Sequence, residues 1–172
     1  NNSCYRHAPT AYEPRSGSTI MAYAGVCSPS LQPNSDAYFH AASIDEIRQA
    51  VSSGLLCGQL TTVNNQAPIV IVDQPVDYLP IGTPFALEGY AIDAEGDSLS
   101  YNREQWDLGN PGQTNAQSAY GPIVRSRPAQ AQGKRIIPQL SDLLAGNQTP
   151  QEILPMTSRN LRFRFTALDH HA

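Results

Sequence analysis

The chain has 172 residues and a net charge of -4, and charged side chains make up only 15% of it. Lys134 is its single lysine, and the arginines form no cluster. Neutralising phosphates needs several cations on one face, so this composition argues against nucleic-acid binding. No apolar run approaches the ~20 residues that span a bilayer, and no basic and apolar leader opens the sequence. This length suits one ordinary domain or two small ones.

Residues 1–57 are polar and irregular except for an apolar stretch and one helix signal over 43–53. Ser43 and Glu46 have the spacing of a capping box, and Gly54 supplies a stop. Apolar residues recur on one face of this segment at helical spacing. That face consists of Ile44, Ile47 and Val51. We predict an amphipathic helix that packs on another element and carries no chemistry.

The polar, uncharged stretch 58–67 is typical of a linker, and beyond it the apolar period changes to two. The predicted strands cover 68–73, 84–92, 98–106 and 160–167. The last alternates most regularly, which places Arg162 and Arg164 toward water. Its predicted inward residues are Leu161, Phe163, Phe165 and Ala167.

A long insertion, 109–159, separates the last two of these strands. It contains one predicted helix, 139–145, closed by Gly146, and a second helical turn that begins at Thr149 with Glu152 at capping-box distance. A seven-stranded sandwich needs about 100 residues. With only four strong strands, the predicted sandwich is incomplete and leaves an open edge with which another chain can pair.

Three cysteines, Cys4, Cys27 and Cys57, are an odd number. In an exported protein two of them would pair, and the third would be free or bonded to another segment. Three buried, reduced thiols are equally compatible with the composition. Both interpretations stay open at this point.

The segment Ser18-Thr-Ile-Met-Ala-Tyr23 resembles the Met-turn of metzincins, zinc proteases whose metal site is built on HExxHxxGxxH. In that clan a methionine forms a hydrophobic floor beneath the zinc-bound histidines. The Met-x-Tyr spacing is also similar to branches in which the tyrosine reaches the zinc or donates to the tetrahedral intermediate. The resemblance implies that Met21 is the floor and Tyr23 the transition-state donor.

The surrounding run, residues 10–27, resembles secreted bacterial reprolysin-like metallopeptidases, in which EPGSGSTIMAYAGIC follows the zinc motif. Arg15 replaces the usual glycine of that run, which we interpret as a surface-level departure. Residues 101–107 are similar to the family's YxWEQxD strand, with Arg103 at the usual tryptophan position. Because arginine is a poor core residue, we expect the core there to be built differently, with Trp106 in the core.

This resemblance implies a mostly β chain in three parts. Residues 1–57 would be the C-terminal part of a metzincin-like catalytic domain, 58–67 a linker, and 68–172 an incomplete immunoglobulin-like β-sandwich with a long insertion. It also implies a secreted or cell-surface protein, with a disulfide between Cys4 and Cys27.

Asp93, Glu95 and Asp97 occupy alternate positions around Gly96, a pattern suited to oxygen coordination of calcium. It resembles the D-x-D-G-D turn of cadherin-like and polycystic-kidney-disease-like modules. A polar β-turn with solvated carboxylates is the alternative. We predict a calcium-stabilised turn.

The histidines, His7, His40, His170 and His171, form no HExxH motif, so the zinc ligands and the glutamate base are absent from this chain. We expect His40 to be structural. The prediction is a fragment of an exported zinc-dependent endopeptidase that acts on protein or peptide substrates and is inactive alone. Its sandwich would serve substrate or surface attachment. The alternative is a non-enzymatic adhesion or fibre-forming protein whose subunits pair through the open edge.

Overall fold

A computed structural model describes residues 6–54, 58, 61, 63–72, 76–109, 115–147 and 149–170. Helices are few in this part of the chain, and the character is mostly β, as predicted. None of its helices combines the length and the apolar character needed to cross a membrane. In chain order the elements are the 3-10 helix η1 (Ala8–Thr10), α1 (Ala41–Ser52), β1 (Ile69–Ile71), β2 (Phe85–Glu88), β3 (Tyr90–Ile92), β4 (Leu99–Gln105), β5 (Lys134–Ile137), α2 (Leu140–Ala145) and β6 (Phe163–Asp169).

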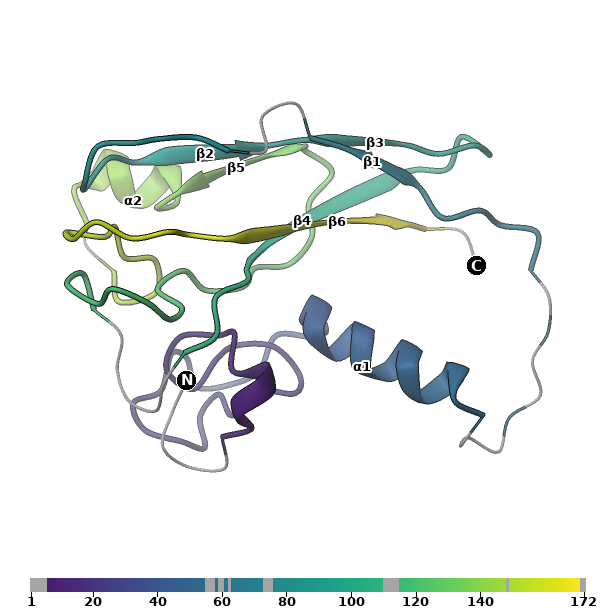
Figure 1. The fold of residues 1–172 in the computed structure, drawn as a ribbon, viewed down its shortest axis with the longest axis horizontal. Coiled ribbons are helices and arrows are strands. Elements are labelled where there is room, and N and C mark those ends of the chain that lie inside the picture. The colour runs from purple at the N-terminus through teal and green to yellow at the C-terminus, as the bar shows by residue number, and fades with distance from the viewer. Residues whose placement is uncertain are drawn as a thin grey trace.

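The described strands form three two-stranded antiparallel sheets, β1–β3, β2–β5 and β4–β6. Figure 1 shows these sheets layered in the upper part of the molecule, with α2 at one end. The N-terminal loops and α1 lie below them. The longest pairing joins β4 to β6 over seven residue pairs, from Leu99 with Asp169 to Gln105 with Phe163. This pairing brings the end of the chain back against its middle.

The strand predicted over 84–92 is divided at Gly89 into β2 and β3, which pair with different partners. Gly89 donates its backbone N–H to the Gly133 carbonyl over 3.1 Å, which extends the β2–β5 register by one pair before the chain changes partner. A Cβ at Gly89 would lie 3.0 Å from the Phe165 ring and 3.2 Å from the Ile71 carbonyl oxygen. Close approach of other groups therefore requires glycine at this break.

The insertion contributes the centre of the hydrophobic core, which sequence reasoning did not anticipate. Ile123, Val124 and Ile137 are at most 1% exposed. Ile137 belongs to β5, a strand missing from the prediction, and it pairs with Phe85 of β2. Partly buried side chains packed on this cluster are Phe85, Leu87, Ile153, Leu161 and Phe163. A long insertion that buries its own apolar residues becomes part of the domain core.

Helix α1 begins two residues earlier than predicted, because His40 and not Ser43 is its N-cap. The Nδ1 atom of His40 accepts a hydrogen bond from Ala42 N at 3.1 Å, so the predicted capping box is wrong. The predicted stop is confirmed, since Gly54 adopts a positive φ of 71°. The predicted packing face is 45% exposed at Ile47 and 41% at Val51. Within the described residues this face is largely uncovered.

Helix α2 closes as predicted, with Gly146 in the left-handed conformation at its C-cap. The helical turn predicted from Thr149 is wrong. Glu152 instead forms an isolated bridge with Val124, and its buried carboxylate accepts a hydrogen bond from Gln139 N at 2.7 Å. A carboxylate that satisfies remote groups is unavailable for capping its own turn.

Candidate functional site

The segment predicted as a Met-turn is a compact loop organised by the carboxylate of Glu13. Glu13 Oε1 accepts hydrogen bonds from the backbone N–H groups of Ser18 at 2.8 Å and Thr19 at 3.2 Å. Its Oε2 accepts from the Thr19 hydroxyl at 2.7 Å. Both Ser18 and Thr19 are buried. One acidic side chain thus replaces the secondary structure that this loop lacks.

Gly17 is required where the loop crosses itself. It adopts a φ of 71°, and a Cβ there would lie 2.6 Å from the Ala22 Cβ. Two backbone hydrogen bonds complete the turn: Ala22 N donates to the Thr19 carbonyl at 3.0 Å and Tyr23 N to the Ser16 carbonyl at 2.8 Å. Residues 16–23 therefore have a defined backbone although they contain no helix or strand.

Met21 and Tyr23 both lie at the surface of this turn. The Met21 side chain is 65% exposed and Tyr23 is 37% exposed. Ile20 and Val26 on the same loop are also exposed. The buried base of the loop and its exposed apolar rim resemble a surface that another segment covers, because apolar side chains exposed together often mark an interaction site.

Arg15 is more than a surface-level departure from the family run, and that interpretation is corrected here. Its φ of 53° lies in the left-handed region, where glycine is favoured. The glycine usual at this position in the resembling proteins would remove this conformational cost of about 1–2 kcal/mol. Arg15 therefore adopts a conformation that glycine would adopt without this cost.

Cys27 is 3% exposed and disulfide-bonded. Cys4 and Cys57 both lie outside the described residues, so the predicted Cys4–Cys27 pairing stays a prediction. A disulfide next to the loop over 16–23 would restrict the unfolded chain and so stabilise the loop.

The loop and α1 are joined to the β region through one buried polar centre at Glu104. Glu104 Oε2 accepts a hydrogen bond from Ala41 N, in the first turn of α1, at 2.7 Å. Its other oxygen accepts from the Ser126 hydroxyl. Ser126 also accepts a hydrogen bond from the Tyr38 hydroxyl at 2.9 Å. Burial raises the pKa of Tyr38, so the phenol keeps its proton and remains a donor.

The residues after Glu104 in the motif connect two further segments. Gln105 Oε1 accepts hydrogen bonds from the backbone N–H groups of Ile123 and Val124, both at 2.8 Å. Gln105 Nε2 donates to Asp107 Oδ2 at 2.7 Å, and Asp107 accepts from the backbone N–H of Arg162 at 3.1 Å. The motif that resembles YxWEQxD thus has a structural role, joining α1, the insertion and β6.

Trp106 packs between the two parts of the chain and is only partly buried. Its ring stacks on Tyr12 with centroids 4.3 Å apart, and His40 lies 5.8 Å from it at a 13° interplanar angle. The Arg164 guanidinium lies 4.6 Å from the Trp106 ring centre. Trp106, which we expected in the core, thus lies at an interface between the N-terminal segment and the sheets.

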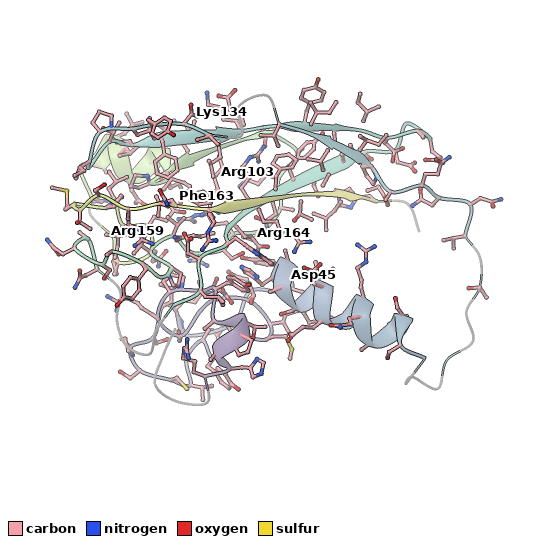
Figure 2. All side chains as sticks on the ribbon, viewed as in Figure 1. Asp45, Arg103, Lys134, Arg159, Phe163 and Arg164 are labelled. Atoms are coloured by element: carbon pink, nitrogen blue, oxygen red, sulfur yellow. The ribbon has the colours of Figure 1, made fainter. Side chains whose placement is uncertain are left out.

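Arg164 does not simply face water, as its place on the alternating strand predicted. It forms a bidentate ion pair with Asp45 of α1, and Figure 2 shows the two side chains approaching from β6 and the helix. Hydrogen bonding from Arg164 holds the pKa of Asp45 below its ordinary value. This ion pair and the Glu104 hydrogen bonds connect α1 to the sheets, and the domain boundary expected at 57/58 stays a prediction.

The expected structural role of His40 agrees with its capping of α1. His7 contacts Thr10, and His170 lies 3.0 Å from the Ser100 hydroxyl at the far end of the sheets. His171 lies outside the described residues. In the described part of the chain no three His, Cys, Asp or Glu side chains are grouped so as to hold a metal. These residues do not fit a zinc centre.

Asp93, Glu95 and Asp97 form a turn after β3. Asp93 Oδ1 accepts the backbone N–H groups of Glu95 at 3.1 Å and Asp97 at 2.8 Å, and Gly96 provides a φ of 80°. The Asp93 carboxylate therefore closes the turn through its own backbone, as in an Asx-turn. This arrangement matches the polar-turn alternative, and the calcium prediction remains to be tested.

If calcium binds here, 5 mM calcium should raise the melting temperature relative to chelator, because a cation relieves repulsion among the three carboxylates. Asp97→Asn should remove most of that increase, whereas Asp142→Asn on α2 should not. Magnesium, which demands octahedral geometry, should have a smaller effect. Identical melting curves in calcium and chelator would leave the turn as a hydrogen-bonded turn only.

Comparisons with protein-family models, curated proteins and solved structures found no significant match for this chain.

Sequence reasoning singled out Met21 and Tyr23 but missed Glu13, which holds their loop in place. It also missed the buried group of Arg135, Glu152 and Arg127 near α2. The sequence carries only a weak signal for this buried group, because it shows no more than arginines separated by one or two residues next to apolar residues.

Proposed function

We propose that this chain is the C-terminal part of an exported zinc-dependent endopeptidase of the metzincin type. Residues 1–57 would complete its catalytic domain, and the β region would be an immunoglobulin-like accessory module for substrate or surface attachment. The observation that supports this best is the loop over 16–23, a hydrogen-bonded backbone on which Met21 is 65% exposed and Tyr23 37% exposed.

In this proposal the exposed Met21 side chain is the apolar floor of a site whose zinc ligands belong to residues outside this chain. Tyr23 is half-exposed on the same loop. Its hydroxyl would donate a hydrogen bond to the oxyanion that forms when a peptide carbonyl is attacked. The disulfide at Cys27 supports export, because disulfides persist in oxidising compartments.

The 172-residue chain should bind no stoichiometric zinc and cleave no peptide. In a longer polypeptide with HExxHxxGxxH ahead of Asn1, Tyr23→Phe should lower kcat roughly 10²-fold with little change in KM, because one oxyanion donor is lost. Tyr120→Phe, at a 63% exposed tyrosine of the β region, is the matched control. Zinc analysis and steady-state kinetics provide the readouts. One tight zinc per 172-residue chain, lost on Tyr23→Phe, would refute this assignment.

The second candidate is a non-enzymatic adhesion or fibre-forming protein. The β1–β3 sheet supports it, because its apolar side chains are exposed: Ile69, Val70, Tyr90 and Ile92 range from 41% to 69%. In this two-stranded sheet each described strand has one neighbour, which leaves edges for strand addition.

A reading frame with HExxHxxGxxH shortly upstream of Asn1 favours the peptidase. Mature chains that begin at Asn1 and assemble in solution favour the adhesin.

A further inference from the structure

A pocket of about 190 Å³ lies between β4, β5 and the start of α2, away from the Met-turn loop. Arg103, Arg127, Lys134 and Arg135 contribute to its lining, and none of its lining residues is acidic. In Figure 2, Arg103 and Lys134 lie near each other on the sheet side of the molecule. A cationic pocket is unexpected in a chain whose net charge is -4.

Two carboxylates adjoin this pocket, and both are already shared with its cations. Buried Glu152 accepts from Arg127 Nε at 2.7 Å and Arg135 Nη2 at 2.8 Å. Glu88 pairs with Lys134 at 2.6 Å in a largely exposed ion pair. Four cations thus face two carboxylates, so the pocket carries an excess of positive charge.

Among these four cations, Arg103 has the fewest negatively charged partners for its charge. It is 3% exposed, and among the described residues it forms no ion pair with a carboxylate. Its guanidinium donates to the Gly133 carbonyl and, at 3.3 Å, to the Gly89 carbonyl, and it packs 4.3 Å from the Phe165 ring centre. Burial, together with the charge of Arg135, lowers the pKa of Arg103 to about 10. A buried arginine normally has an anionic partner.

Two donors in this group also lack acceptors. The Nε atoms of Arg103 and Arg135 are buried and have no hydrogen-bond partner. Gln130 and Gln139 add neutral amide groups to the lining. Guanidinium and amide groups together form a donor-rich surface that matches planar or tetrahedral oxyanions.

We propose that this pocket binds a small oxyanion, a carboxylate or a phosphate or sulfate group, between Arg103, Arg127, Lys134 and Arg135. The volume suits a single such group, because sites for drug-sized ligands occupy about 300–1,000 Å³. The proposal does not depend on the peptidase assignment, since the pocket lies on the β region.

Thermal unfolding and titration calorimetry of the 172-residue chain test whether the pocket binds an anion. Sodium phosphate, sulfate and acetate are each compared with sodium chloride at equal ionic strength. A bound anion at a concentration ten times its Kd should raise Tm by about 3–6 °C, and the increase should saturate. Preference for acetate would indicate the carboxylate of an acidic side chain or chain end. Preference for phosphate or sulfate would indicate an esterified or free anion.

Lys134→Gln changes an exposed rim side chain and is expected to fold, while weakening binding about tenfold. Arg127→Gln should abolish binding, and Arg127→Lys should retain part of it. Arg48→Gln, on the exposed face of α1, is the charge-matched control and should bind as wild type. Equal Tm shifts in chloride and in all three anions, or unchanged binding in Lys134→Gln and Arg127→Gln, would overturn the proposal.

Discussion

Glu104→Ala is expected to lower the free energy of unfolding by about 3–4 kcal/mol, the largest effect of any single truncation we predict. Glu104 is 1% exposed and accepts hydrogen bonds from Ala41 N and the Ser126 hydroxyl. Its loss leaves a helix-start N–H and a buried hydroxyl without an acceptor. Each such hydrogen bond to a charged group contributes about 1.5–3 kcal/mol.

Urea unfolding followed by circular dichroism and by the fluorescence of Trp106 measures this effect. Glu46→Ala, an exposed glutamate on α1, is the matched control and should change stability by less than about 0.5 kcal/mol. Because Glu104 joins α1 to the sheets, both probes should report one transition in the wild type. A Glu104→Ala variant as stable as Glu46→Ala would show that this polar centre does not hold the two regions together.

Glu152→Gln should produce the second largest effect, and a pH-dependent one. Burial alone would raise the pKa of Glu152, but hydrogen bonds and charge from Arg127 and Arg135 outweigh burial and hold the pKa below its ordinary value. A depressed folded-state pKa means that the ionised carboxylate stabilises the fold fully above the unfolded pKa of about 4.3. That contribution is lost as the pH falls through the lower, folded pKa.

At pH 7 the Glu152→Gln substitution should therefore cost about 3 kcal/mol, because it leaves two guanidinium groups without their shared anion. Urea unfolding between pH 7 and pH 3 should show the difference from wild type narrowing at the acidic end. Glu88→Gln, at the exposed pair with Lys134, should cost less than about 1 kcal/mol. A wild-type to Glu152→Gln difference that is constant with pH would contradict this coupling.

Local patterns in the sequence predicted local structure well. Apolar residues at a period of two located β4 and β6 within a few residues, although in the structure burial does not alternate along β6. Glycines at the ends of α1 and α2 marked both helix stops, because only glycine enters the left-handed conformation without cost. The start of α1 was misplaced because His40, three residues before Ser43, caps the helix.

The candidate site was predicted only in part, and for a related reason. A short run identified Met21 and Tyr23 through its resemblance to metzincins, which tells nothing about how their loop is held. Glu13 holds it through hydrogen bonds to residues five and six positions later, a contact range with no fixed sequence period. The cationic pocket had no sequence signal, because tertiary packing brings Arg103 of β4 next to Arg135 of β5 across 32 positions.

The sequence by itself determined the mostly β character of this chain, its two helix ends and the position of the Met-turn-like run. These follow from backbone preferences and side-chain periodicity, which act over a few residues. Only the tertiary structure decided which partner each buried charged group has. Glu104 meets Ala41 across 63 positions and Arg135 meets Glu152 across 17. Desolvation makes such groups stable only beside their partners, and chain topology, not local sequence, brings those partners together.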